Sequence, residues 1–102
     1  MSDISSLHRS LVAGVLEGEG RASPAIRRAA FDNEGLEEPL GQFVEKVAHN
    51  ARLVTDADIG TLKKDGLSED QIFEIVVCAA IGQATRQYEN ALAALTAAAE
   101  GS

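Results

Sequence analysis

Apolar residues recur along this chain at intervals of three and four, which is the spacing of one face of an α-helix. Aromatic residues make up only 4% of the chain and tryptophan is absent, so the pattern favours packed helices over strands. Ser23 and Pro24 open one helix, because serine caps a helix start and proline suits the first helical position. The expected helices cover about residues 3–17, 23–33, 37–54, 55–66 and 68–99. We therefore predict an all-α fold of about five helices in a single domain, 1–102.

Capping signals set the boundaries of the last two helices. A capping box pairs a hydroxyl residue with a carboxylate or amide three positions later, and two are expected, at Thr55 with Asp58 and at Ser68 with Gln71. Gly66 between them ends the shorter helix. The two helices are thus predicted to meet at a tight turn.

Two of the predicted helices each have a clear apolar face. The first carries its apolar stripe at Ile4, Leu7, Leu11, Val12 and Val15. The third carries Leu40, Phe43, Val44, Val47, Ala51 and Val54. We expect both faces to be buried.

The last helix is apolar on nearly every side from Ile72 to Ile81. Such a helix is enclosed by neighbours all round, and a chain of this size offers few of them. We therefore expect a homo-oligomer formed through the 72–88 helix. Small side chains would let the helices of two subunits approach closely, at Ala79, Ala80, Gly82 and Ala84.

The overall charge narrows the range of partners. A formal net charge of -7 and a pI near 4.7 oppose binding to nucleic acid or to anionic membrane surfaces. The start, MSDISSLHRS, lacks a basic segment followed by an apolar run, so we expect no secretory signal. No apolar run is long enough for a membrane span. The single cysteine, Cys78, excludes a disulfide within one chain and fits a reducing compartment, so we expect a cytoplasmic protein.

The stretch VTDADIGTLKKDGLSEDQIFEIVVCAA, followed by a long helix, resembles the carboxymuconolactone decarboxylase family, which includes the alkylhydroperoxidase D-like proteins. The resemblance is carried by GLSEDQI, from Gly66 to Ile72, and by the small residues after it. It covers about residues 40–95, a little over half of the chain. It implies an alkylhydroperoxidase D-like helical hairpin in which GLSEDQI forms the turn and the start of the second arm.

The peroxidatic motif of that family is missing. Catalytic members have Cys-x-x-Cys followed four residues later by His, and the corresponding positions here are Ala51, Val54 and Asp58. Neither alanine nor valine can form the thiolate that attacks a peroxide, so we expect no thiol peroxidase activity by the family route. The stretch is closer to the cysteine-free half of double-repeat relatives. The family's decarboxylase branch does not need the cysteines, which leaves other enzymatic activities open.

Three residues are candidates for acid/base chemistry, namely Glu74, His49 and Glu45. Glu45 and His49 lie four apart on one helix and can form an acid/base pair, although an ordinary surface ion pair is the favoured interpretation. Glu74 interrupts the apolar run on the face of Cys78. A carboxylate there needs a positive or donor partner. We favour a structural or interfacial ion pair with an arginine over a ligand-binding role.

The candidate ligand-binding residues are Arg86, Tyr88, Arg52 and Cys78. Arg86 and Tyr88 follow the apolar run and would sit at one end of a pocket, whereas Cys78 is favoured as a core residue. With only two histidines in the chain we expect no metal site, and no cofactor is predicted. His8 is expected to be exposed and without a partner.

These observations favour a non-peroxidatic member of the family, an accessory or small-molecule-binding oligomer. A second hypothesis is a cysteine-independent lyase or isomerase acting on a small organic acid. A third is a protein–protein interaction module without a pocket. A cavity lined by the acid/base candidates favours the enzyme, and a solid core with a large flat interface favours assembly.

Overall fold

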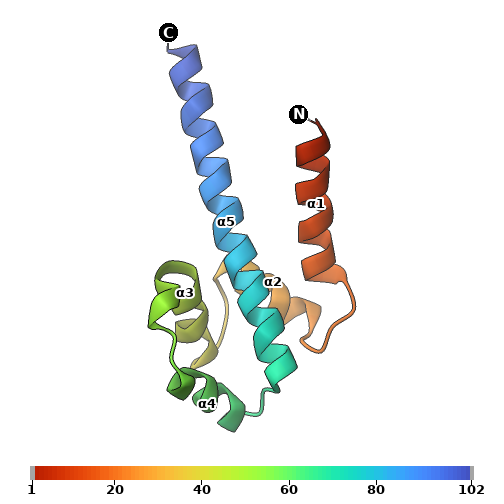
Figure 1. The fold of residues 1–102 in the computed structure, drawn as a ribbon, viewed down its shortest axis with the longest axis vertical. Helices are drawn as coiled ribbons and strands as arrows, with labels where there is room; N and C mark the ends of the chain where they lie inside the picture. The colour runs from red at the N-terminus through yellow and green to blue at the C-terminus, as the bar shows by residue number, and fades with distance from the viewer. Residues whose placement is uncertain (1, 102) are drawn as a thin grey trace.

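The computed structural model describes residues 2–101 and the side chains of 6–101, and it consists of helices joined by short loops, with no strand in that range. The all-α prediction is confirmed. The elements are α1 (Ser2–Glu17), α2 (Pro24–Asp32), α3 (Leu40–Asn50), the 3-10 helix η1 (Ala51–Leu53), α4 (Asp56–Lys64) and α5 (Glu69–Glu100). Figure 1 shows α5 running the whole length of the molecule, with α1 on one side of it and α3 and α4 on the other. No helix in this range is long and apolar enough to cross a membrane.

The predicted caps are present. Ser23 Oγ accepts a hydrogen bond from the backbone amide of Ile26 at 3.2 Å, with Pro24 opening α2. Both capping boxes form, at the starts of α4 and α5, and Gly66 takes a positive φ of 101° in the turn between them. The third helix begins at residue 40, later than expected, because Pro39 disfavours helical backbone at the residue before it.

The core lies where α5 packs against α2, α3 and α4. The predicted apolar face of α3 is confirmed over most of its length, since Leu40, Phe43, Val44 and Val47 are buried. Ala51 is exposed, because the chain leaves the α-helical path at η1. We call this part, α2, α3, α4 and residues 69–85 of α5, the base.

Small residues let α5 approach α2 within a single chain. A Cβ atom added to Gly82 would lie 1.9 Å from the carbonyl oxygen of Phe31, and Ala79 is fully buried beside it. The prediction that these two residues serve contact between subunits is therefore wrong. Ala80 and Ala84, the other two small residues, are exposed.

The segment from Ile72 to Ile81 is covered on one side only within the chain. Ile75 and Cys78 are buried against the base, whereas Phe73 is 69% exposed. Every residue of α5 from 87 to 100 is exposed, and we call this part the arm. The arm projects beyond the base along the longest dimension of the molecule, 54 Å (Figure 1).

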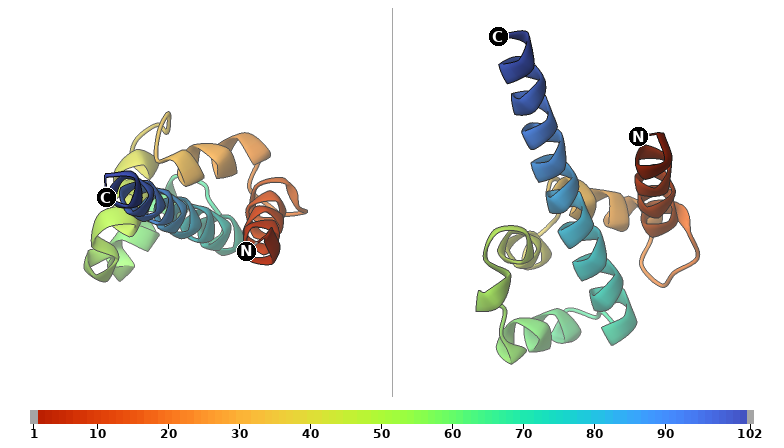
Figure 2. Two further views of the ribbon diagram at one scale, coloured as in Figure 1. Left: turned by 90° about the horizontal axis from the view of Figure 1, so that it is seen from above. Right: turned by 45° about the horizontal axis from the view of Figure 1, so that its top comes forward.

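The apolar stripe of α1 is buried only toward its C-terminal end. Leu16 is buried and Val12 and Val15 are partly buried, but Leu7 and Leu11 are 70% and 53% exposed. The expectation for those two residues is wrong, and that for Ile4 falls on a side chain outside the described ones. Figures 1 and 2 show the reason, which is that α1 and α5 diverge toward the ends of the chain.

Candidate functional site

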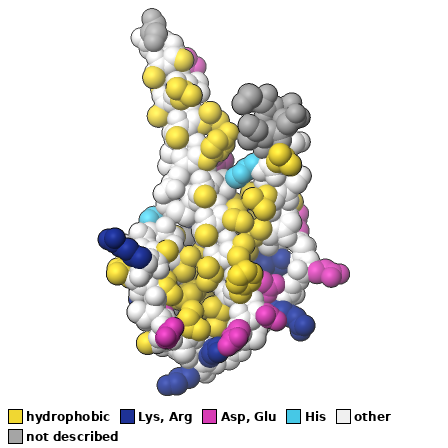
Figure 3. Space-filling model, in the orientation of Figure 1, with side chains coloured by type: hydrophobic (Ala, Val, Ile, Leu, Met, Phe, Trp, Pro, Cys, Tyr) yellow, Lys and Arg dark blue, Asp and Glu magenta, His cyan; other side chains and the backbone are white. Residues whose placement is uncertain are grey.

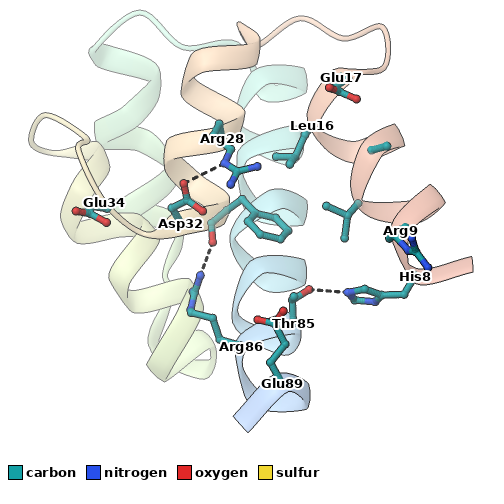
Figure 4. Close-up of a pocket in the computed structure, with 13 residues that line it drawn as sticks. His8, Arg9, Leu16, Glu17, Arg28, Asp32, Glu34, Thr85, Arg86 and Glu89 are labelled. Carbon is teal, nitrogen blue, oxygen red and sulfur yellow. Dashed lines mark hydrogen bonds and ion pairs between the residues drawn. The ribbon is translucent and has the colours of Figure 1, made fainter. Parts of the chain in front are cut away.

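A cleft of about 620 Å³ lies between α1, α2 and α5. Figure 4 shows its side chains converging from the three helices. Its walls combine apolar groups with both signs of charge, and they include His8, Arg9, Val12, Leu16, Arg28, Phe31, Asp32, Thr85, Arg86 and Glu89. This mixture suits a small molecule that has an apolar body and a charged group.

His8 joins α1 to α5 at the mouth of the cleft. Its Nε2 lies 3.3 Å from the hydroxyl of Thr85, which is buried (Figure 4). Its ring lies 6.0 Å from that of Tyr88. The expectation that His8 has no partner is therefore wrong. The sequence does carry a signal for it, since His8 lies one helical turn before Val12 and shares its face. The described residues include no carboxylate within hydrogen-bond or ion-pair distance of the His8 ring.

The arginines of the cleft differ in how far they are already engaged. Arg86 donates to the carbonyl oxygen of Phe31 at 2.6 Å and to Gln83 at 3.0 Å, which fixes it across the end of α2. Arg28 pairs with Asp32 at 3.1 Å. Arg9 has no hydrogen-bond or ion-pair partner among the residues that the structure describes. Among the described residues, the cleft thus offers one uncommitted guanidinium group, that of Arg9, and two engaged ones.

Glu74 lies outside this cleft and holds the loop between α1 and α2. Its carboxylate accepts hydrogen bonds from the backbone amide of Arg21 at 2.7 and 2.9 Å and from that of Ala22 at 3.0 Å. A Cβ atom at Gly20 would lie 1.9 Å from Glu74 Oε1, so glycine is what lets the loop close on the carboxylate. The partners of Glu74 are therefore backbone amides and not an arginine.

Cys78 and Arg27 lie next to Glu74 under α1. They share with it the lining of a pocket of about 150 Å³. Cys78 is 1% exposed, and burial raises the pKa of its thiol, which Arg27 opposes and Glu74 reinforces. A buried thiol with a raised pKa is a poor nucleophile.

Arg27, one of the four arginines that the sequence offers as partners for Glu74 together with Arg28, Arg52 and Arg86, instead has a structural role at the end of α1. It is 5% exposed, and its Nη1 donates to the carbonyl oxygens of Val15 at 3.2 Å and Gly18 at 2.7 Å, at the end of α1. Its Nε is buried without a partner. The available signal was its position three and four residues before Ala30 and Phe31, on the buried face of α2.

Glu45 and His49 form an exposed pair on α3, with Glu45 Oε1 3.6 Å from His49 Nε2. Glu45 also accepts a hydrogen bond from Asn33 Nδ2 at 2.6 Å, where Asn33 caps α2 with a left-handed backbone. Neither residue lines the cleft or the pocket that contains Glu74. The three acid/base candidates are thus distributed over two separate places.

The remaining candidates are also dispersed. Arg52 is exposed on η1, and Tyr88 faces α1 from the arm. Asp58, at the position corresponding to the family's histidine, has a lowered pKa because it accepts a hydrogen bond from the Thr55 amide and another from Lys46 at 3.0 Å. No group of three potential metal ligands gathers in the described part of the chain.

Comparison with protein-family models, with curated proteins and with solved structures finds no match for this chain. The structure combines two features around α5. A cleft with both polar and apolar walls lies behind the helix, and uncovered apolar surface lies on its opposite side. Figure 3 shows hydrophobic side chains gathered along α5 and across to α1.

Proposed function

We propose that the chain is a noncatalytic, oligomeric protein that binds a small organic acid in the cleft between α1, α2 and α5. The cleft volume of about 620 Å³ lies within the usual range for small-molecule sites, roughly 300–1,000 Å³. The observation that carries the proposal is that one cleft holds an uncommitted guanidinium, Arg9, beside the His8–Thr85 hydrogen bond and the apolar Phe31. The guanidinium can pair with a carboxylate while the apolar wall covers the rest of the ligand.

We further propose that the protein is carboxymuconolactone decarboxylase-like and non-peroxidatic. This rests on the resemblance of residues 40–95, in which GLSEDQI occupies the turn between α4 and α5. The only thiol is buried in α5, away from the positions of the family's cysteines. The acidic surface and the single buried cysteine support placing it in the cytoplasm.

The geometry favours binding over the lyase or isomerase hypothesis. The carboxylate of Glu74 is engaged by the amides of Arg21 and Ala22, and His49 is an exposed residue of α3. A general acid or base must lie within hydrogen-bond reach of the reacting group. Neither candidate lines the cleft.

Self-association through α5 is part of the proposal. The face of α5 that contains Phe73 is uncovered, and the arm is exposed on all sides. Contiguous apolar surface of this kind marks contact sites. The same apolar surface also supports the interaction-module hypothesis. That hypothesis differs from the present proposal because it predicts no ligand in the cleft.

NMR titration tests the cleft directly. Acetate, succinate and benzoate are added in turn to the ¹⁵N-labelled protein, and we expect amide shifts at His8, Thr85 and Arg86. Arg9→Gln should weaken binding roughly ten-fold, since a charged hydrogen bond contributes about 1.5–3 kcal/mol. Arg52→Gln removes an exposed arginine outside the cleft and serves as the matched control. An absence of shifts at millimolar concentration, or equal losses in both variants, would refute the site.

A further inference from the structure

α5 has two opposite apolar faces, of which the chain covers only one. At about 100° per residue, the buried face centres on Ile75, and a second set of positions lies on the other side of the helix. We call this set the open stripe, and it consists of Phe73, Val77, Ala80, Ala84, Tyr88, Ala91 and Leu95. All of them are exposed except Val77, which is partly covered, and none is charged.

The open stripe is symmetric about Ala84. Steps of four, seven and eleven residues from Ala84 reach an apolar residue in both directions. The resulting pairs are Ala80 with Tyr88, Val77 with Ala91, and Phe73 with Leu95. A second copy of the helix, turned about a two-fold axis at Ala84, would place every stripe residue against its counterpart.

We propose that two copies of this chain pair antiparallel along α5, with the two-fold axis passing through Ala84. The inference deepens the self-association proposed above and rests on it. Side-chain size fits a crossing of two helices, because alanine lies at the centre and allows close approach there. The larger Phe73 and Leu95 fill the space where the helices diverge.

The uncovered apolar area supplies part of what a stable dimer needs. Phe73 and Tyr88 are 69% and 48% exposed, and with roughly 150–250 Å² per aromatic side chain they offer on the order of 200 Å². Beside the open stripe, further exposed leucines extend this surface along the arm and onto the edge of α1, at Leu92, Leu7 and Leu11. In a standard interface each partner buries about 800 Å², and the surface around the open stripe is continuous enough to contribute to it.

The charge distribution is compatible with a second copy on the open stripe. The chain carries a net charge of -7, so two copies repel each other over most of their surfaces. The open stripe avoids this repulsion, because it contains no charged side chain although the helix as a whole is acidic. A two-fold axis also makes the surface complementary to itself, which an unrelated partner does not require.

This arrangement leaves the α2 side of the ligand cleft open. Arg86 and Glu89 line the cleft from the side of α5 that faces away from the open stripe. The second copy covers a neighbouring groove of about 450 Å³ lined by Leu11, Ile81 and Tyr88, which shares His8, Arg9 and Thr85 with the cleft. Because the ring of Tyr88 lies beside that of His8, the second copy would hold Tyr88 against a residue that lines the cleft.

Sedimentation at micromolar concentration tests the pairing. The unmodified chain should be a dimer, Ala84→Glu should be a monomer because two carboxylates meet at the axis, and Ala93→Glu should remain a dimer. Ala93 is the matched control, since it is exposed on the same helix and lies nine residues away, on the opposite face. Circular dichroism checks that all three are equally helical. A dimeric Ala84→Glu overturns the proposed axis alone, whereas a monomeric unmodified chain also overturns the proposed self-association.

Disulfide trapping tests the direction of the pair. Under oxidation, a mixture of Ala80→Cys and Tyr88→Cys chains should form an 80–88 disulfide near the crossing point, with little dimer from either variant alone. Two Ala80 positions would lie about 12 Å apart in the antiparallel pair, at roughly 1.5 Å per residue. A disulfide needs Cα atoms within about 7 Å. Self-linking of either variant, or no link in the mixture, overturns the antiparallel register.

Discussion

The base and the arm share one helix, α5, but differ in what surrounds it. In the base, Ile75 is fully buried between α5 and helices distant in sequence, whereas Phe73, two residues earlier, is 69% exposed. In the arm, every residue from 87 to 100 is exposed. An apolar sequence therefore shows that a helix needs covering, but not whether its own chain or a second copy provides the cover.

The largest difference in the free energy of unfolding is expected between substitutions at two residues of the same helix. Ile75→Ala should lower the free energy of unfolding by roughly 2–5 kcal/mol, because it leaves a cavity in the core. Phe73→Ala should change it by less than about 0.5 kcal/mol, since the side chain lies in water. Urea unfolding of both variants in the Ala84→Glu background measures this without a contribution from association. Equal losses would mean that the two faces of α5 are not distinct.

The next largest difference in stability is expected between glycine-to-alanine substitutions in two helices. Gly82→Ala should destabilise the fold by about 1–3 kcal/mol, because the new methyl group would collide with the backbone of Phe31. Gly60→Ala is the control, since a Cβ atom there meets nothing within 4 Å, and it should stabilise α4 by roughly 0.5–1 kcal/mol. Thermal unfolding compares the two. A stabilising Gly82→Ala would contradict the close packing of α2 on α5.

A smaller effect is expected at the loop before α2. Glu74→Gln should lower stability by about 1–2 kcal/mol, because neutral acceptors replace the charged ones on the amides of Arg21 and Ala22. Glu89→Gln, on the exposed arm, should have almost no effect. Amide exchange at Arg21 and Ala22 should accelerate only in the first variant. Unchanged exchange would show that the carboxylate does not hold the loop.

The smallest expected effect is the extent to which an alkylating reagent labels the thiol of Cys78 in the native protein. Because burial raises the pKa of its thiol and shields the sulfur, iodoacetamide should label native protein very slowly at neutral pH and much faster once the protein is unfolded in urea. An introduced Ala84→Cys, on the open stripe, should react at the rate of a free thiol in a monomeric sample. Mass spectrometry follows both. Rapid native labelling of Cys78 would contradict its burial.

Local signals account for how well the helices could be predicted. The starts of α2, α4 and α5 depend on residues within three positions of one another, as at Ser68 and Gln71. The apolar face of α3 is read from one turn to the next. Such features need no knowledge of the rest of the chain.

The site depends on contacts that no local pattern specifies. Glu74 has backbone amides as partners, and which amides approach a carboxylate is decided by the path of a distant loop. His8 and Thr85 are 77 residues apart. Gly82 serves contact with α2 and not with a second subunit because the crossing point of two helices depends on their packing angle.

The contact between Glu74 and the loop before α2 also anchors α1 to the base. Arg21 and Glu74 are 53 residues apart, so the contact closes a long stretch of chain, and such closure costs conformational entropy. The three hydrogen bonds to the carboxylate offset part of that cost. One wall of the cleft, α1, is therefore held in place by a carboxylate that lies outside the cleft.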